Sequence, residues 1–552
     1  MTDIQALARA AREALAWAAT QREVSEAEVF VSANATLLCR LCYTSHIPSN
    51  GVEEPKSSEG HGVGIHVVLH AGGRRLVGFG SEPGDLTPDG IARAFAKARR
   101  AAVCDPEFVS LPRPVEIMGG LEGPPNPPER SHTPRETRGA ARTSDSFIGS
   151  ERRTLWAYHD PALMAIDDDA LVEAGWTVIR GALRTFRASS ALAAMAGGEG
   201  ALPKLGLIVG GDVTVLQERM ALASTHLPRV ETDESTLITA SITAMVEAAD
   251  AKGSGWSTGT RLEDFTDEAG VEAAERAIGA LSGRRVPSGL YTVVFGPQPV
   301  AELVSNLVTP ACTASAFYAS STPFLGKLGQ RVAAPRLTIV DDGAVPGRMG
   351  SKGVTCEGLP TGRTVLIADG VLEGCLASWY ETQRLLRDRD LSAKLGAGGA
   401  RAERALVPRN GFRFGRGGRQ FDTTPSTAAS NIVVSGRDPV AVDHLVERVR
   451  HGLLVGRIWY CYAINGLAAG DFTCTVVGDS YIIRDGRIVA PLTANAIRIN
   501  DNITRLLEHL VDIGTDTRGV ALWAADEVVY APSIAVEGVP VEAIAAFMEG
   551  LD

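Results

Sequence analysis

The chain has 552 residues, which allows two to four domains, and its 45% hydrophobic and 22% charged residues are typical of a folded globular protein. Its net charge of −11 argues against nucleic acid as the main partner, because phosphate binding requires clustered lysine and arginine side chains. Eight scattered cysteines and the lack of an uninterrupted 18-residue apolar run exclude a disulfide framework and a transmembrane helix, so we expect a cytoplasmic protein without a membrane partner.

The first 112 residues predict an N-terminal α/β domain. Residues 3–20 carry apolar side chains at helical spacing, and the stretch 26–45 is interpreted as a β-hairpin. Two further strands are predicted around a Gly72–Gly73 turn. The helix that follows these strands has Asp85 and Thr87 as possible capping residues.

The rest of the chain divides by composition and periodicity. Residues 113–165 are interpreted as an insertion or linker, because residues 113–153 are rich in Pro, Arg, Ser and Thr. Residues 166–284 predict a middle α/β segment that completes the N-terminal domain, and residues 285–552 predict a β-rich, mainly antiparallel C-terminal domain. The predicted fold class is therefore α+β, and we expect the N-terminal domain to be a mixed sheet with helices on one face.

A strand predicted at 291–295 turns into a helix at 300–308, a common place for catalytic residues. The polar residues of this helix are Glu302, Ser305 and Asn306. No pair of them at four-residue spacing is a His or Cys ligand pair suited to zinc, so the residues themselves indicate a structural helix.

Two other sets of metal-binding residue types are weak candidates. His66 and His70 share a strand face but stand about 13 Å apart, which is too far for one ion. Cys39 and Cys42 form a CxxC motif, but on a strand this spacing directs the thiols to opposite faces, which favours core packing.

The basic, glycine-rich segment 400–421 carries three phenylalanines and allows two interpretations. Basic residues interleaved with aromatic ones are typical of single-stranded nucleic-acid binding. We favour a mobile loop at a cleft, because the whole chain is acidic. Six arginines between Arg130 and Arg153 are interpreted in the same way, as part of a solvated linker.

An ordered series of motifs spans residues 324–385. It contains Gly326 and Gly329, Asp341-Asp342-Gly343, Gly350-Ser351, Glu357-Gly358, Leu366-Ile367 and Asp369-Gly370-Val371-Leu372. This series resembles the core of the TldD/PmbA family, whose members are known as modulators of DNA gyrase and as peptidases. The resemblance covers most of the chain outside 113–165, and it implies a dimeric protein.

In the TldD branch of that family, the helix carries His-Glu-x-x-x-His and a later cysteine completes a zinc site. Here the matching residues are Ala301, Glu302 and Asn306, and residues 518–534 contain no cysteine. Glu302, Ser305 and Asn306 are thus the degenerate positions of the metal helix. The resemblance implies a PmbA (TldE)-like subunit with no catalytic residue, metal or cofactor of its own.

Such a subunit pairs with a zinc-containing TldD-type peptidase that processes or degrades small or unfolded peptides, or the chain forms a homodimer. The resemblance suggests these positions along a peptide cleft: Asp341, Asp342, Glu357 and Asn431. One alternative is a stand-alone hydrolase or modifying enzyme of peptide or natural-product biosynthesis, with Cys356 as its nucleophile. Another is a regulatory protein that touches nucleic acid through the segments 130–153 and 401–419.

Overall fold

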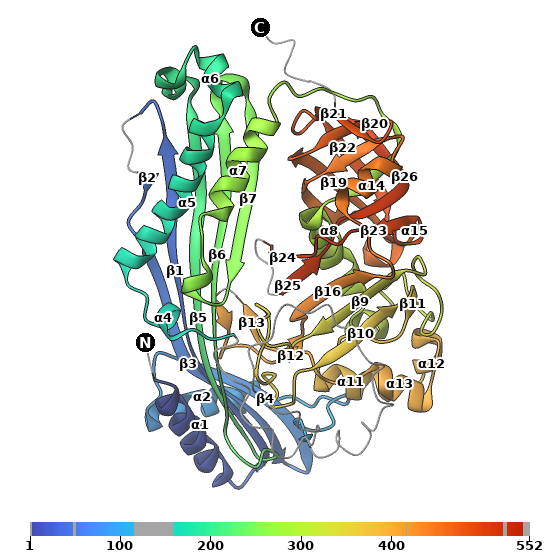
Figure 1. The fold of residues 1–552 in the computed structure, drawn as a ribbon. Coiled ribbons are helices and arrows are strands. Elements are labelled where there is room, and N and C mark those ends of the chain that lie inside the picture. Colours follow the sequence, from blue (N-terminus) through green and yellow to red (C-terminus); the bar gives the residue numbers. More distant parts are fainter. Residues whose placement is uncertain (1–2, 48–50, 115–157, 416, 523–526, 545–552) are drawn as a thin grey trace, which may run out of the picture.

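The computed structural model describes residues 3–47, 51–114, 158–415, 417–522 and 527–544. Two sheet-rich bodies lie side by side, as Figure 1 shows: one is built around a seven-stranded sheet and the other around a nine-stranded and a six-stranded sheet. The predicted α+β class, with a β-rich second half, is therefore confirmed. No described helix combines the length and the apolar character needed to cross a lipid bilayer.

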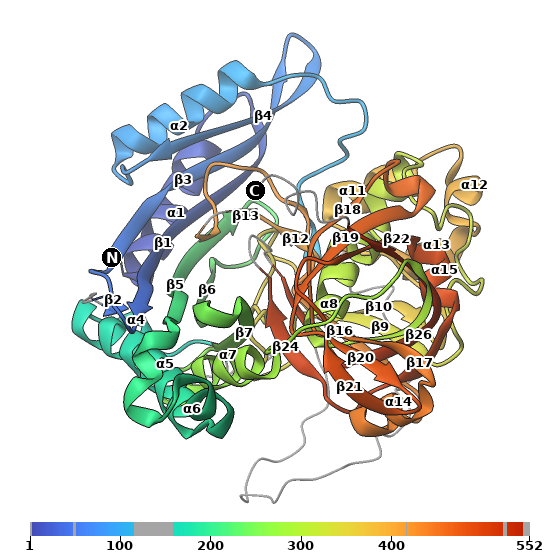
Figure 2. The same cartoon turned by 90° about the horizontal axis from the view of Figure 1, so that it is seen from above.

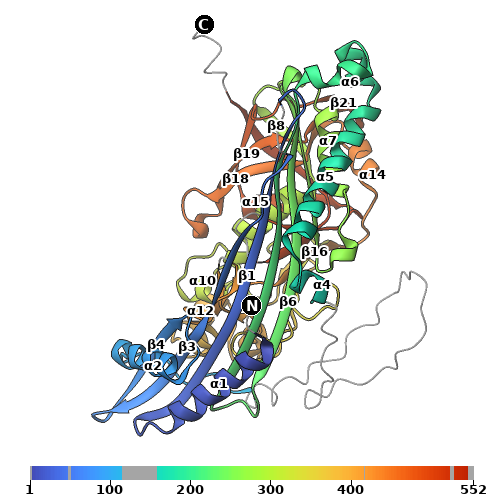
Figure 3. The same cartoon turned by 90° about the vertical axis from the view of Figure 1, so that its left-hand side faces the viewer.

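The seven-stranded sheet takes strands from both sides of the segment 113–165. Its strands are β1 (Val24–Thr44), β2 (Gly51–Val52), β3 (Lys56–Ala71), β4 (Arg74–Pro83), β5 (Leu207–Ser224), β6 (Glu231–Val246) and β7 (Ala251–Gly259). The main order is β4-β3-β1-β5-β6-β7, and β2 pairs with β1. Figure 3 shows how far β1 and β6 run along the molecule.

Two details of the prediction for this domain are wrong. The sheet is not mixed, because every described strand pair in it is antiparallel. The stretch 26–45 is not a hairpin but part of the single 21-residue strand β1. Continuous pairing explains this, because β1 is bonded to β3 along one edge and to β5 along the other over most of its length. The predicted Gly72–Gly73 turn between β3 and β4 is confirmed.

Helices cover one face of this sheet, as predicted. They are α1 (Ile4–Ala19), α2 (Pro88–Ala101), α4 (Pro161–Met164), α5 (Asp168–Ala188), α6 (Ser190–Ala196) and α7 (Glu268–Gly279), with short 3-10 turns at Glu199–Leu205, Glu247–Ala249 and Leu262–Asp264. Thr87 caps α2 by accepting a hydrogen bond from the backbone N–H of Gly90. Odd-numbered residues of β1, such as Val29, Val31 and Leu41, pack under these helices.

The even-numbered residues of β1 point the other way, because successive side chains of a strand alternate between faces. Phe30 packs with Phe412 and Phe421 of the C-terminal domain. Figure 2 shows the N-terminal sheet with its helices beside the C-terminal strands. The second face of the sheet is therefore an interdomain face rather than a solvent face.

The C-terminal domain is mainly antiparallel, as predicted, with parallel pairs between β8 and β17 and between β16 and β25. The nine-stranded sheet contains β8 (Gly289–Phe295), β17 (His451–Val455), β18 (Arg457–Ala463), β19 (Asp471–Gly478), β20 (Tyr481–Arg484), β21 (Arg487–Pro491), β22 (Ile497–Asn502), β23 (Leu510–Ile513) and β26 (Ile534–Ala543). The six-stranded sheet contains β9 (Leu337–Asp342), β10 (Arg363–Ala368), β11 (Val371–Leu372), β16 (Asn431–Gly436), β24 (Arg518–Ala521) and β25 (Val528–Ala531).

Short helices fill the space around these two sheets. They are α8 (Pro297–Leu303), the π-helical turn η5 (Val304–Val308), α9 (Thr309–Ala311), α10 (Ala314–Tyr318), α11 (Trp379–Leu386), α12 (Leu391–Leu395), α13 (Gly399–Ala405), α14 (Val442–Arg448), the 3-10 turn η6 (Leu467–Ala469) and α15 (Ile503–Glu508). One hydrophobic cluster runs through both sheets and includes Phe295, Val300 and Leu307. The strand–helix junction singled out in the sequence therefore lies in the main core.

The segment 411–427 connects the two domains. It forms two small ribbons, β12 (Gly411–Phe412) with β15 (Ser426–Thr427) and β13 (Phe414–Gly415) with β14 (Gly418–Arg419). The interpretation of 400–421 as a mobile loop is wrong for this part, because Arg413 and Arg419 are fully buried in ion pairs with the N-terminal sheet. These two arginines are not available to nucleic acid.

Candidate functional site at the domain junction

The helix that follows β8 begins abruptly and is buried along almost its whole length. Pro297 occupies the first turn of α8, where its missing N–H costs nothing. After Leu303 the helix widens into the π turn η5, and the backbone N–H of Thr309 bonds to the carbonyl of Val304, five residues back. Such π turns often mark functional sites.

The π turn bears on the spacing of positions 301 and 306. In a regular α-helix a residue five positions on lies well past one full turn, so the two side chains diverge. A wider π turn brings position 306 back towards the face of position 301. In this chain Ala301 is fully buried, whereas Asn306 is exposed.

Glu302 is held by a ladder of amides on its own helix. The Gln298 amide donates a 3.0 Å hydrogen bond to Oε1 of Glu302, and the Asn306 amide donates a 2.9 Å hydrogen bond to Oε2. Asn306 also donates to the backbone carbonyl of Glu302. Burial raises the pKa of Glu302, while the two amides and the nearby charge of Arg457 oppose this rise.

These residues do not fit the zinc ion that the metal helix of the TldD branch carries. Zinc needs imidazole, thiolate or free carboxylate ligands that converge on one point. Both oxygens of Glu302 are taken by amide N–H groups, and burial raises the pKa of the neighbouring thiols of Cys461 and Cys474, which keeps them protonated. The described part of the chain contains no group of three His, Cys, Asp or Glu residues placed to hold a metal ion.

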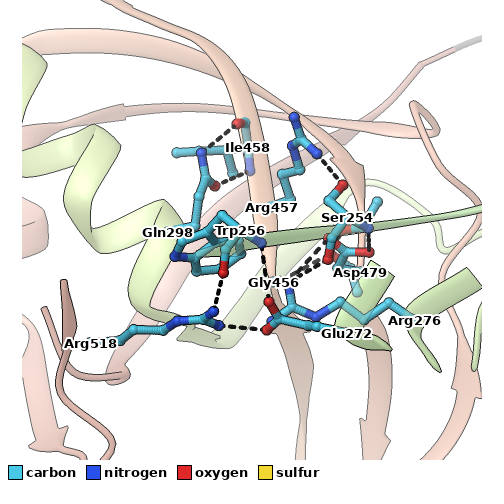
Figure 4. A network of polar contacts seen from close by, with 12 residues as sticks. Ser254, Trp256, Glu272, Arg276, Gln298, Gly456, Arg457, Ile458, Asp479 and Arg518 are labelled. Atoms are coloured by element: carbon cyan, nitrogen blue, oxygen red, sulfur yellow. Dashed lines mark hydrogen bonds and ion pairs between the residues drawn. The ribbon is translucent and has the colours of Figure 1, made fainter. Parts of the chain in front are cut away.

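A polar network beside α8 joins the two domains, as Figure 4 shows. The Gln298 amide pairs with the backbone of Ile458 on β18, accepting from its N–H at 3.1 Å and donating to its carbonyl at 3.4 Å. Next to it, the indole ring of Trp256 on β7 contacts the guanidinium groups of both Arg276 and Arg518, which lie 4.9 and 4.3 Å from the ring centroid.

Glu272 links the two arginines beside that indole ring. It accepts 2.6 Å contacts from both Arg276 and Arg518. Asp479, which is almost fully buried, accepts a 3.1 Å hydrogen bond from the backbone N–H of Ser254, and Arg457 reaches the hydroxyl of the same serine. The degenerate metal helix is therefore fixed against the N-terminal sheet by charged groups from both domains.

The predicted cleft residue Asp341 lies in a buried hydrogen-bond hub. It accepts from the backbone N–H and hydroxyl of Ser430 at 2.8 and 2.9 Å and from the Asn410 amide. Burial raises its pKa to about 6 despite these donors.

Asn431 is the second residue of this hub. It accepts from the Gly350 N–H at 2.8 Å and donates to the carbonyl of Asp342 and the hydroxyl of Ser351. The structure thus brings Asp341, Asp342 and Asn431 together and gives them a structural role, and their part in binding peptide stays a prediction.

Glu357 lies apart from that hub, at a cavity between the two domains. Both of its carboxyl oxygens accept from the backbone N–H of Trp379, at 3.0 and 2.9 Å. Burial is the main reason why its pKa rises to about 8. Its neighbour Cys356 is fully buried and burial raises the pKa of its thiol to about 12, so the structure does not support Cys356 as a nucleophile.

The two other pairs of candidate metal ligands, His66 with His70 and Cys39 with Cys42, do not form shared sites in the structure. His70 is exposed, whereas His66 faces the interdomain cavity, so the two do not share a site. Cys39 is fully buried and Cys42 is partly exposed. The arginines between 130 and 153 lie outside the described residues.

Sequence reasoning missed Gln298 and the buried arginines of 411–427. The signal for Gln298 was present, because positions 298, 302 and 306 repeat polar side chains every four residues in an otherwise apolar helix. No local signal marked Arg413, because its partner Glu28 is 385 residues away in the chain.

Comparison with known proteins places these observations in a family. Residues 288–543 match the PmbA/TldA metallopeptidase C-terminal domain. The chain is 25% identical over 252 residues to a metalloprotease of Methanothermobacter thermautotrophicus, covering 46% of this chain and 49% of that protein. It is 38% identical over 103 residues to the metalloprotease TldD homolog of Haemophilus influenzae, covering 19% and 21%.

The matched regions span about half the length, or less, of these curated relatives. Over the whole length, the fold is similar to the crystal structure of TldE from Thermococcus kodakarensis, with a TM-score of 0.67, 17% identity, and coverage of 97% of this chain and 100% of that chain. The domain match, the related metalloproteases and the shared fold agree with the motif series in 324–385. Residues 288–543 therefore form a C-terminal domain of the PmbA/TldA metallopeptidase type, and the fold of the whole chain is similar to that of TldE.

Proposed function

We propose that this chain is the non-catalytic, TldE-like subunit of a heterodimeric TldD/TldE-type peptidase, and that zinc and peptide cleavage belong to its TldD-type partner. The observation that carries this proposal is the state of Glu302. Where the metal helix of the TldD branch has two histidines around a glutamate, this chain has Ala301 and Asn306, and the glutamate is saturated by amides. A general base must be free to accept a proton from its substrate, and this carboxylate is not.

The surface next to α8 supports a partner subunit. Strand β18 lies at the end of the nine-stranded sheet, and the side chains of Tyr460, Tyr462 and Ile464 are 67%, 54% and 48% exposed. Exposed aromatic residues on a sheet edge are typical of protein–protein contacts. A partner bound there would lie beside the helix that carries Glu302, because Gln298 links α8 to β18.

The test uses the full chain co-expressed with a TldD-type subunit from the same organism. We expect the two to co-elute, zinc to be found at one ion per heterodimer, and peptidase activity to depend on the partner's metal. Removing two aromatic anchors with Tyr460→Asp and Tyr462→Asp is expected to abolish co-elution while the isolated variant stays folded.

The role of Glu302 separates this proposal from a catalytic one. Glu302→Gln in the heterodimer is expected to change the peptidase rate less than about twofold, whereas loss of a general base costs about 100-fold or more. A rate that falls by that factor, or a stoichiometric zinc ion bound to the isolated chain, contradicts the proposal.

A further inference from the structure

A cavity of about 210 Å³ lies between the N-terminal sheet and the C-terminal domain, away from the hub of Asp341 and Asn431. Its walls combine the aromatic rings of Phe108, Trp379 and Tyr380 with the carboxyl groups of Glu28, Asp105 and Glu357 and the imidazole of His66. The Asp105 carboxylate accepts a 3.1 Å hydrogen bond from the Tyr380 hydroxyl. The cavity is smaller than the 300–1,000 Å³ typical of sites for drug-sized ligands, so it suits a small group.

The polar atoms of this cavity are an unusual set because several have no protein partner. Glu28 is only 1% exposed, and its Oε1 accepts a 2.6 Å hydrogen bond from Arg413, but its Oε2 has no hydrogen-bond partner among the described residues. The ring of His66 contacts Phe79 and Phe108, and neither of its nitrogens is hydrogen-bonded within the described part of the chain. Glu28 and His66 both line the cavity, so these atoms are open to water or to a polar ligand there.

The charge state of the cavity defines what that ligand must supply. Burial, helped by the positive charge of Arg413, lowers the pKa of His66 to about 3, so its imidazole is neutral and offers one acceptor nitrogen. Glu28 is balanced by Arg413. Glu357 carries a proton at neutral pH, because burial raises its pKa to about 8.

We propose that this cavity binds a primary ammonium group attached to a small apolar or aromatic moiety, with the ammonium held by Glu28, Glu357 and His66. An ammonium group has three N–H donors, and these three side chains offer three acceptors once Glu357 is ionised. The rings of Phe108, Trp379 and Tyr380 favour a cation and an apolar attachment.

Binding is coupled to the release of one proton from Glu357 to solvent. The bound ammonium replaces that proton, so the net charge of the cavity stays constant, and no bond other than this O–H bond breaks. The groups that face Glu357 from the surrounding elements and set this exchange are Glu28 on β1, His66 on β3, Asp105 in the loop after α2, Arg413 between β12 and β13, and Tyr380 on α11.

The experiment is isothermal titration calorimetry of the full chain with benzylamine and with its neutral analogue benzyl alcohol. We expect benzylamine to bind, benzyl alcohol not to bind, and one proton to be released per benzylamine, seen as a dependence of the heat on the buffer. At pH values below the pKa of Glu357, the affinity for benzylamine is expected to increase by up to tenfold for each unit by which the pH is raised. Equal binding of both probes, or no binding of benzylamine at millimolar concentration, overturns the proposal and leaves a water-filled cavity.

Two peptide probes distinguish the sources of such an ammonium group. The first probe is phenylalanyl-glycine amide with a free amino terminus. If it binds with an affinity similar to that of benzylamine, the ligand is the amino terminus of a peptide, and the N-acetylated form of the same probe is expected not to bind. If only benzylamine binds, the site takes a free small amine. Binding of the acetylated peptide as tightly as the free one contradicts the role of the ammonium group.

Variants localise the effect. Glu357→Gln keeps an acceptor for the Trp379 N–H but cannot ionise, so we expect benzylamine binding about 10-fold or more weaker and no proton release. Thr424→Phe, at the exposed rim of the cavity, is expected to block binding without touching the core. Glu403→Gln on the exposed face of α13 is the matched control and is expected to bind as the unaltered protein does. Unchanged binding in both Glu357→Gln and Thr424→Phe refutes the site.

Discussion

Arg413 donates a 2.6 Å hydrogen bond to Glu28, and this single pair joins the C-terminal domain to the middle of the N-terminal sheet across 385 residues of chain. Both side chains are almost completely removed from water. Close by, Arg419 bonds to Asp233 at 2.7 Å, and Glu218 accepts from the Arg419 N–H at 2.8 Å. The interdomain face of the sheet therefore carries buried charged groups that form ion pairs across the two domains.

Removing one partner of the buried pair is expected to destabilise the protein strongly. Arg413→Met leaves the Glu28 carboxylate buried and unpaired, which costs about 3–5 kcal/mol. The double variant Glu28→Gln with Arg413→Met removes both charges and is expected to be more stable than Arg413→Met alone. Urea unfolding compares the single and the double variant with the unaltered protein. Arg40→Met is the control, because the pair of Arg40 with Asp212 is solvent-exposed and its loss is expected to cost about 1 kcal/mol or less. A double variant as unstable as the single one contradicts this account.

Close backbone packing at the same interface depends on a glycine of β3. A Cβ atom at Gly64 would lie 2.1 Å from the backbone carbonyl oxygen of Phe421, so Gly64→Ala must push the connecting segment away from the sheet. We expect a loss of about 1–3 kcal/mol in unfolding free energy. Gly60→Ala on the same strand meets no atom within 4 Å and serves as the control. Equal thermal midpoints for the two variants would show that the segment can shift at no cost.

These contacts explain how far the sequence could predict the structure. The sequence of β1 predicted β structure, but as a hairpin rather than as one long strand, whereas the helices followed from amphipathic patterns elsewhere in the chain. The alternation of side chains along β1 presents Glu28, Ser32 and Asn34 as polar, which is typical of a solvent face. Only the position of a segment almost 400 residues later makes them interior, and no local pattern carries that information.

For the candidate site, the sequence could predict the residue types but not the backbone geometry. The residue types at 301, 302 and 306 were visible in the sequence, and so was the absence of histidine. The π turn was not, because backbone hydrogen-bond register in a helix depends on its tertiary contacts. The hydrogen bonds from Gln298 and Asn306 to Glu302 follow from four-residue spacing, but their use to saturate a buried carboxylate required the structure.

Stability is expected to depend on pH through Glu357. Its pKa is about 8 in the folded protein against an ordinary value of 4.5, so the folded state keeps a proton that the unfolded state releases. This contribution is fully present below about pH 4.5 and is lost as the pH rises to about 8. Glu357→Gln has no such loss, so its stability relative to the unaltered protein should rise by about 1.4 kcal/mol per pH unit across this window.

Denaturant titrations at several pH values check this expectation, with Glu403→Gln as the control. The difference between Glu357→Gln and the unaltered protein should be flat above about pH 8, because both states are then ionised. A difference that is constant from pH 5 to pH 8 would show that Glu357 titrates normally and that the cavity is wet enough to solvate its charge.

Replacing the exposed amide of the helix ladder tests how Glu302 is held. Asn306→Asp removes two donors to Glu302 and places a second carboxylate next to it, so the two acids can no longer both be ionised without repulsion. We expect a loss of about 1–3 kcal/mol at pH 8 and a smaller loss at pH 5, because a shared proton relieves the repulsion as the pH falls. The control is Asn465→Asp, which makes the same change next to Asp471 at a solvent-exposed site and should cost less than about 1 kcal/mol. If Asn306→Asp lowers the unfolding free energy no more than Asn465→Asp does at both pH values, the hydrogen bonds from the amides do not hold Glu302 in place. The carboxylate is then free enough to act on a substrate.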